Sequence, residues 1–520
     1  MRKSLFTALL LVFTIACVLV GCSDSQNSEG NEASAKTPES EATDTNENSP
    51  SVVRIAMSTE IDNLDPYQSA ATDTGSMMDN VFDGLLDTDE AGELVGAIAT
   101  SYDISDDGLT YTFTLNEGVL FHDGTELTSE DVLYSYEKLA GLNGGEPIVS
   151  QFEVIESIET PSDYEVVIHL KEKNSAFLAA NIRAIVPAGY EEQSTEPIGA
   201  GPFKFAEYKV GQELRLVKNE DYYNLEKVPQ IDEVQFKIMP DQESSVLAMQ
   251  AGEIDVIPGI TQQALLQLGD SVNTVSGPQN MVQILALNND VEPYSDVKVR
   301  QAINLAIDKD TIIETVSEGN GTKLGSNFSP AMEFYYESGL EDYYATNIDE
   351  AKSLLAEAGY EEGFQMELTV PSDYQFHVDT AQVIAEQLSQ VGIDVEIKMI
   401  EFSTWLENVY ENEQYDTTII GFTGKLDPYE ILRRYVSDYG SNFINYNNAA
   451  YDAIIDQALA ATDKNEIADY YKEAQRMLTK DAVSVFISDP DRTIAMRGNL
   501  EGLKMYPIQK FNLEDLQFTE

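Results

Sequence analysis

The chain has 520 residues, of which 42% are hydrophobic, 31 are Lys or Arg and 91 are Asp or Glu, giving a formal net charge of −60. A surface with this charge repels nucleic acids and anionic lipids, so both are excluded as partners. The length predicts roughly two to four domains or lobes, and the charge favours a soluble monomer. The acidic surface is either a solvated exterior or a means of attracting cationic solutes.

Cysteine and histidine are scarce. Cys17 and Cys22 both lie in the first segment, which leaves no cysteine further along for a disulfide, a thiolate nucleophile or a sulfur ligand. The three histidines, His122, His169 and His377, do not have the spacing of metal ligands. The sequence therefore predicts no metal site and no cofactor.

The first segment has the pattern of a secretory signal. Arg2 and Lys3 precede an almost wholly apolar stretch over 5–21, which fits a signal-peptide core better than a membrane span. It ends in Leu-Val-Gly-Cys at 19–22, which resembles the lipobox of bacterial lipoproteins. The resemblance implies a signal peptide over 1–21 and lipidation of Cys22, which would anchor the protein on the extracytoplasmic face of the cell membrane. The alternative is an uncleaved signal anchor.

A polar segment follows the lipobox. Between Ser23 and Pro50 there is no aromatic residue and no Leu, Ile, Val or Met. Such a segment cannot bury enough apolar surface to offset the entropy lost on ordering. We therefore expect residues 22–50 to be a disordered acidic tether.

Strand and helix patterns alternate from residue 52 onward. Residues 52–57 predict a buried opening strand, while 110–115 and 164–170 alternate apolar and polar side chains as half-buried strands do. The stretch 128–131 has capping-box spacing and precedes an apolar helical face.

Helical spacing is clearest in the second half. Apolar stripes precede Gly359 and Gly392, each of which supplies a helix stop, and a strand is expected over 393–400. Another stripe begins at Tyr451. Trp405, the single tryptophan, is interpreted as a core residue, with a ligand-stacking platform as the alternative. Repeated alternation of helix and strand predicts an α/β fold.

Catalytic motifs are absent from the sequence. There is no Gly-x-Ser-x-Gly elbow, no His-Glu-x-x-His and no Walker-type phosphate loop. The stretch 103–108 begins like a calcium loop, but Thr114 stands where the final Glu is needed, so a turn entering a hairpin explains it better. Chance carboxylate pairs among 91 acidic residues are weak support for a glycosidase. We expect no catalytic residues and no enzymatic activity.

Several short sequence motifs follow one another along the chain, at 101–113, 118–124, 127–132, 199–203, 252–255, 299–308 and 351–360. In this order they resemble the family 5 bacterial extracellular solute-binding proteins, which include dipeptide-, oligopeptide- and nickel-binding members. Tyr102 stands where the familiar pattern has Trp.

The resemblance implies a two-lobed, periplasmic-binding-protein-like α/β fold, with an extra subdomain on the first lobe and a two-stranded hinge. The chain would cross between the lobes near 283–287 and 488–494, where apolar strands occur. The implied parts are lobe I over 51–285 with the extra subdomain at about 83–190, lobe II over 286–490, and a return to lobe I over 491–520.

The resemblance also suggests where the solute binds. In peptide-binding members, the amino group of the ligand pairs with an aspartate in a loop that reads roughly Gly-Trp-x-Gly-Asp and is followed by Asp-Pro. The counterpart here is 421–429, one residue shorter, with Lys425 in place of that aspartate. The candidate ligand contacts are Tyr67, Arg183, Phe422, Lys425, Asp427 and Tyr429.

Two of these candidates predict the charge of the solute. In relatives, the stretch 181–187 runs along the cleft, so Arg183 and Lys425 would both face a closed site of low dielectric. Two cations there favour a carboxylate-bearing solute. The alternative is that Lys425 points to solvent or pairs with Asp427.

The function implied is capture of a peptide or similarly sized solute in the cleft. Lobe closure would then present the complex to the permease and ATPase of an ABC importer. Three alternatives remain: a non-peptide solute (an oligosaccharide, an opine-like compound or a chelated metal), a sensor with the same fold, and a lipid-anchored hydrolase with two carboxylates.

Overall fold

The first strand lies inside the sheet of lobe I. In the computed structural model, which describes residues 50–69 and 71–519, β1 (Val52–Met57) occupies the predicted residues. It pairs in parallel with β10 (Glu233–Ile238) and β11 (Val256–Pro258). The other regular elements of lobe I are α1 (Thr72–Met78), β8 (Phe203–Lys209), β9 (Glu213–Lys218), α3 (Gln242–Ala251), α4 (Gln262–Leu268), β12 (Val272–Pro278), β19 (Leu500–Glu501) and β20 (Gln517–Phe518).

An extra subdomain is inserted between β1 and β8. Its antiparallel sheet has the order β4-β5-β7-β6, formed by β4 (Ala99–Ile104), β5 (Thr110–Leu115), β6 (Ile155–Ser162) and β7 (Glu165–Leu170). Helix α2 (Ser129–Ala140) begins at Thr128 with the predicted capping box. The hairpin of β2 (Leu86–Thr88) and β3 (Leu94–Gly96) and the 3₁₀ segments η1 (Ser150–Phe152) and η2 (Ser175–Ile182) complete the subdomain.

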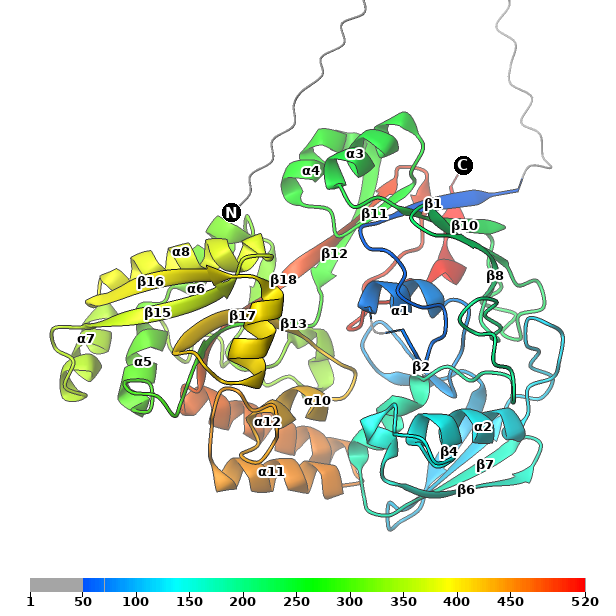
Figure 1. Ribbon diagram of the computed structural model, residues 1–520, viewed down its shortest axis with the longest axis horizontal. Coiled ribbons are helices and arrows are strands. Elements are labelled where there is room, and N and C mark those ends of the chain that lie inside the picture. The colour runs from blue at the N-terminus through cyan, green and yellow to red at the C-terminus, as the bar shows by residue number, and fades with distance from the viewer. Residues whose placement is uncertain (1–49, 70, 520) are drawn as a thin grey trace, which may run out of the picture. The chain divides into compact units, whose positions relative to one another are not determined.

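Lobe II has strands covered by helices on both faces (Figure 1). Its elements are β13 (Met281–Leu287), α5 (Val297–Ala306), α6 (Lys309–Val316), β14 (Gly321–Lys323), η4 (Pro330–Tyr335), α7 (Ile348–Glu357), β15 (Phe364–Pro371), α8 (Gln375–Ser389), β16 (Ile393–Ile400), α9 (Phe402–Trp405), β17 (Thr417–Thr423), α10 (Tyr429–Leu432), α11 (Ala449–Ala460), α12 (Lys464–Lys480) and the first half of β18 (Ser484–Arg497).

A single path of paired strands joins the two lobes. Its order is β16-β15-β17-β13-β18-β11-β1-β10-β9-β8, and β18 is the strand that belongs to both halves (Figure 1). The first half of β18 pairs with β13 in lobe II, and the second half pairs with β12 and β11 in lobe I. The predicted two-lobed α/β fold is confirmed.

The two crossings between the lobes lie side by side. Pro278 pairs with Asp491, and Gln283 pairs with Ser488. The chain therefore enters lobe II between β12 and β13, a few residues before the predicted crossing at 283–287. The apolar run that suggested that position is β13 itself. Its side chains are buried because helices cover both faces of the strand.

Several local predictions can be checked directly. Trp405 is 2% exposed and donates from Nε1 to Thr418 Oγ1 at 2.8 Å, which confirms the core interpretation. The predicted stripes form α7, α8 and α11, and the strand after Gly392 is β16. Among the described residues, no helix is long and apolar enough to cross a membrane. Cys22 and most of the expected tether lie outside the described residues.

Candidate ligand cleft between the lobes

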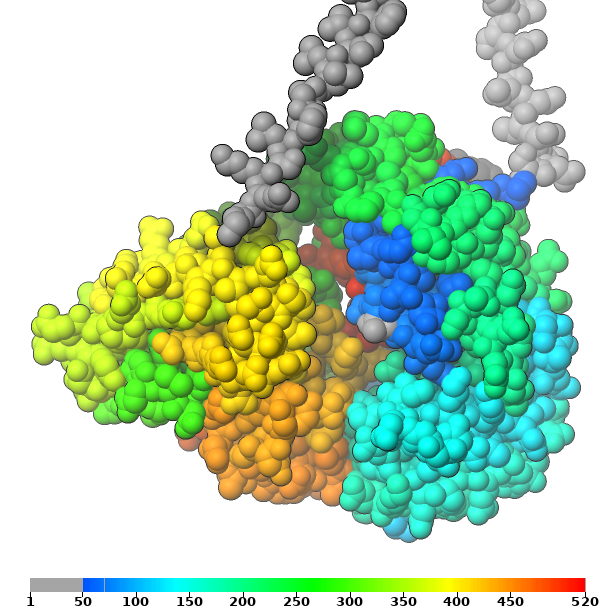
Figure 2. Space-filling model, in the orientation of Figure 1, coloured from blue at the N-terminus to red at the C-terminus, as the bar shows by residue number. Residues whose placement is uncertain are grey.

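A cavity of about 450 Å³, called here the main cavity, lies between the lobes. Its lobe I wall comes from the loop and helix at 64–79, from η2 with the following Arg183, and from Ile508 and Gln509. Its lobe II wall is the loop that follows β17, residues 423–427, together with Glu430. This volume is within the usual range for small-molecule sites. Figure 2 shows the opening between the blue part of lobe I and the yellow part of lobe II.

Lys425 lies in the lobe II wall, and the preceding residue, Gly424, packs closely against Asn280. A Cβ at Gly424 would lie 2.2 Å from the Cγ of the fully buried Asn280, so only glycine fits there. The Lys425 side chain is exposed in the cleft. Its ammonium group makes no ion pair or hydrogen bond with any described residue. Burial between the lobes lowers the pKa of Lys425, and the charge of Arg183 lowers it further.

Arg183 provides the facing positive charge from lobe I. It follows η2, and its backbone N–H donates to Ala180 O at 3.2 Å. Its guanidinium, like the Lys425 ammonium, has no ion pair or hydrogen bond among the described residues. Nearby, burial raises the pKa of Asp79 to about 6, against the opposing fields of Lys510 and Arg183. The cavity therefore presents two cations whose charge no direct contact neutralises.

Asp427 is an acidic group on the same loop, two residues after Lys425. Its Oδ1 accepts a hydrogen bond from the Tyr429 N–H at 2.7 Å, and no described group donates to Oδ2. Burial raises the pKa of Asp427 to about 7. Lys425 and Asp427 do not form an ion pair, so that part of the alternative is wrong in this structure.

The other three predicted contacts do not line the main cavity. Tyr67 is buried in lobe I and donates to Ala184 O at 2.7 Å. Phe422 packs beneath the Arg434 guanidinium, 4.8 Å from the ring centre. Tyr429 lines a neighbouring groove with Arg433, which lies 5.4 Å from its ring centre. These three side chains therefore lie outside the lining of the main cavity, next to residues that form its walls.

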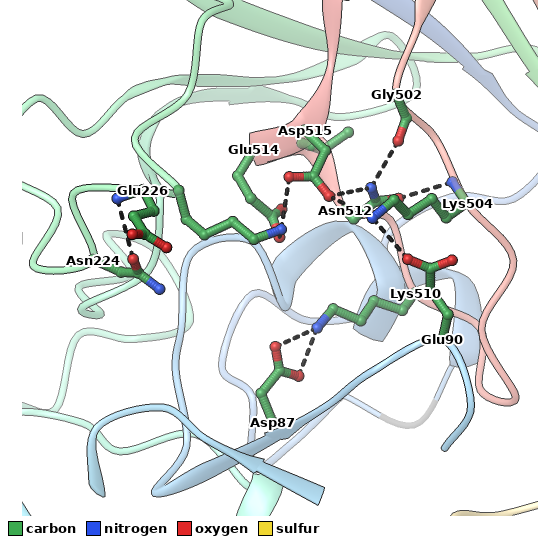
Figure 3. Close-up of polar contacts among 12 residues, drawn as sticks. Asp87, Glu90, Asn224, Glu226, Gly502, Lys504, Lys510, Asn512, Glu514 and Asp515 are labelled. Carbon is green, nitrogen blue, oxygen red and sulfur yellow. Dashed lines mark hydrogen bonds and ion pairs between the residues drawn. The ribbon is translucent and has the colours of Figure 1, made fainter. Parts of the chain in front are cut away.

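Sequence reasoning missed the contribution of the C-terminal return. Figure 3 shows how this segment is tied to lobe I: Lys510 pairs with Asp87 at 2.5 Å and Lys504 with Glu90 at 2.7 Å. These ion pairs flank Ile508 and Gln509, and Gln509 also hydrogen-bonds Asp73. No local sequence pattern in residues 504–510 predicts that this segment lines the cleft. Asp79 was missed in the same way, whereas Glu430 follows the Asp-Pro pair closely enough to have been considered.

The comparisons with known proteins concern the family and the fold. The family model described as bacterial extracellular solute-binding proteins, family 5 Middle, matches residues 93–443. Over 99% of this chain and 98% of the relative, the sequence is 29% identical to the oligopeptide-binding protein AppA of Bacillus subtilis.

Two solved structures with bound solutes are also similar. The periplasmic binding protein DppA from Helicobacter pylori, in complex with the peptide STSA, is 26% identical with a TM-score of 0.74, covering 90% of this chain and 98% of that one. AgaA from A. tumefaciens R10, in complex with agropinic acid, is 26% identical with a TM-score of 0.72, covering 90% and 99%. On the family match and the shared two-lobed fold, the chain belongs to the bacterial extracellular solute-binding proteins of family 5.

Proposed function

We propose that this protein captures a peptide-like solute bearing a free carboxylate in the main cavity and delivers it to the permease and ATPase of an ABC importer. The observation that carries the proposal is the pair of cations, Arg183 and Lys425, on opposite walls of one cavity without ion-pair partners among the described residues. A carboxylate placed between them gains charge-assisted hydrogen bonds in a site that excludes much of the water.

Asp427 suits the other end of such a solute. Its Oδ2 is free to accept from an ammonium group, and it lines the same cavity as the two cations. A zwitterionic peptide therefore has a partner for each terminal charge. The net charge of −60 acts mainly on the approach of the solute, because salt screens it beyond about 8–10 Å while groups in the cleft are screened less.

A second candidate is a non-peptide acid of the opine type. Lys425 replaces the aspartate that binds the peptide amino group in the family pattern, and the similar protein AgaA holds agropinic acid. Such a solute would use Arg183 and Lys425 but would not depend on Asp427.

Binding should be tested with a peptide panel whose terminal charges are removed one at a time. Free, C-amidated and N-acetylated tripeptides are titrated into the wild type, Lys425→Asp and Arg183→Gln, with Lys352→Asp on the outer helix α7 as the charge control. Amidation and either cleft substitution should weaken binding at least about tenfold, because each removes a desolvated charge contact. Unchanged affinity in Lys425→Asp would sink the assignment of that residue. N-acetylation separates the two candidates, since only the zwitterion depends on Asp427.

Proton release provides an independent check on Asp427. Because burial raises its pKa to about 7, Asp427 exchanges a proton near neutral pH. A bound ammonium lowers that pKa, so binding near neutral pH should release protons. Calorimetry in buffers of different ionisation enthalpy measures this release, and Asp427→Asn should abolish it.

The proposal also includes the setting in which the protein acts. Cys22 is the lipidated first residue of the mature protein, the anchored protein is a monomer, and the cleft holds its solute without turning it over. Cys22→Ala should leave the protein unprocessed or release it from membranes, as fractionation would show. Scattering should detect compaction when the right solute is added, and a solute at about 100 times its Kd should add about 2.7 kcal/mol of stability.

A further inference from the structure

A second cavity, called here the side pocket, lies next to the main cavity between the extra subdomain and lobe II. Its volume is about 230 Å³. Figure 2 shows the surfaces that meet there, with the orange helices α11 and α12 against the cyan subdomain. Leu426, Asp427 and Ala179 line both cavities, so the two cavities adjoin at these residues, called here the neck. A group of a solute in the main cavity would reach the side pocket past these three residues.

The walls of the side pocket combine apolar and polar side chains, and the apolar ones come from both sides. The subdomain contributes Tyr102, Ile104, Tyr111 and Leu178, and lobe II contributes Tyr335 and Ile467. Tyr102 and Ile104 are unusual because they remain 38% and 37% exposed on β4, whose other outward residues are small or polar. Exposed apolar side chains gathered in a concave site mark a binding surface more often than chance.

Most polar groups at the rim already have partners. Lys464 forms an ion pair with Glu93, which joins the edge of lobe II to the subdomain. Ser175 Oγ donates to Ala458 O at 2.9 Å, and Asn174 Oδ1 accepts from the Ala176 N–H at 3.0 Å. The charged groups left are Lys173, which is exposed to solvent, and Asp427 at the neck. Away from Asp427 at the neck, the interior therefore offers little to a charged group and more to an apolar one.

We propose that the side pocket is a specificity subsite that takes an aromatic or branched aliphatic side chain of the solute. The volume is sufficient, because a cavity of about 150 Å³ lined by apolar side chains already holds benzene. Asp427 at the neck would bind the ammonium group of the peptide, which belongs to its first residue. The side chain that enters the side pocket is therefore the side chain of the first residue. This inference rests on the proposed function for its choice of peptide probes.

The test compares where a phenylalanine is placed. Phe-Gly-Gly, Gly-Gly-Phe and Gly-Gly-Gly are titrated into the full-length protein, and indole is added separately as an apolar probe that needs no peptide site. Phe-Gly-Gly should bind about tenfold or more tightly than the other two, because it alone buries its ring in the side pocket.

Two wall variants and one control complete the design. Ile104→Asn should cut the preference for Phe-Gly-Gly at least about threefold and weaken indole binding, since it makes the wall polar. Val95→Asn changes an equally exposed apolar residue on the neighbouring β3, outside the pocket, and should leave both unchanged. Ala461→Phe fills the pocket from lobe II and should have the same effect as Ile104→Asn, which guards against a folding defect in either variant.

The outcomes separate the two proposals. Equal affinity for all three peptides in the wild type overturns the subsite while the proposed function stands. If no peptide binds but indole stabilises the wild type and not Ile104→Asn, the subsite stands and the peptide function falls. If neither peptides nor indole bind, both are overturned.

Discussion

The lobes meet in two places that differ in kind. At the hinge, two strands cross side by side and the polar groups between them are fully buried. Asp489 accepts from the Gln279 N–H at 3.2 Å and from Ser329 Oγ at 2.5 Å, and Asn280 donates to Pro507 O at 2.8 Å. These contacts persist because breaking any of them leaves a buried group unsatisfied.

The far contact joins the subdomain to α11 and α12, and water reaches it. Its ion pair, Lys464 with Glu93, has side chains 48% and 38% exposed, and one hydrogen bond from Ser175 accompanies it. Exposed pairs of this kind contribute little net free energy. We therefore expect the lobes to rotate about the hinge, where the contacts stay intact, while the far contact breaks and forms again as the solute leaves and binds.

The largest effect is expected from Asp489→Asn at the hinge. Burial raises the pKa of Asp489 to about 7, above its unfolded value of about 3.9. Between these pH values the native state binds the extra proton, so the stability it contributes is present at low pH and is lost as the pH rises toward 7. The slope is at most about 1.4 kcal/mol per pH unit.

Thermal melts of the wild type and Asp489→Asn from pH 4 to 8 measure this contribution as the difference between the two curves. That difference should change between pH 4 and 7 and stay constant above. Asp394→Asn, at an exposed position on β16, is the control. A difference that does not vary with pH would contradict a buried, titrating hinge carboxyl.

A smaller effect on stability is expected from Gly424→Ala, which strains the contact between the loop at 423–427 and Asn280 at the hinge. The new Cβ would clash with the buried Asn280 side chain, whose amide is already held by Pro507. Overpacking of this kind costs about 1–3 kcal/mol. Denaturant melts should show the loss, and the displaced Lys425 should weaken solute binding. Gly440→Ala is the matched control, since nothing lies within 4 Å of its Cβ.

The smallest effect is expected from Lys464→Ala at the far contact. Unfolding free energy should fall by less than about 1 kcal/mol, and the loss should shrink as salt is added. Scattering without solute should show a larger average separation of the lobes. A loss of several kcal/mol would mean that the far contact is as rigid as the hinge, and the comparison would fail.

Local elements could be predicted from the sequence far better than the cleft. The opening strand, the capped helix after Thr128 and the strand after Gly392 each carry a short-range signal of periodicity or capping, and each forms at the predicted residues. The expected crossing lies a few residues too late, because β13 is apolar except for Gln283 and its pattern does not show where the pairing partner changes.

The cleft depends on residues that only the fold brings together. Lys425 and Arg183 were found through the resemblance, because a loop motif and a neighbouring stretch marked them. The side pocket joins β4 to the start of α12, more than 350 residues later in the chain, and no pattern in either segment refers to the other. Tyr102 was noticed only as a departure from the family's tryptophan, without a role.

The late position of β18 has a consequence for how the protein is made. This strand completes the sheets of both lobes, and the cleft wall also includes Ile508 and Gln509, which follow β18 in the chain. A growing chain therefore has neither finished sheet until β18 has been synthesised, and no finished cleft until residue 509 has been added. Loss of the chain from β18 onward, by a premature stop or by proteolysis, would remove solute binding from a protein that still carries nearly every residue of lobe II.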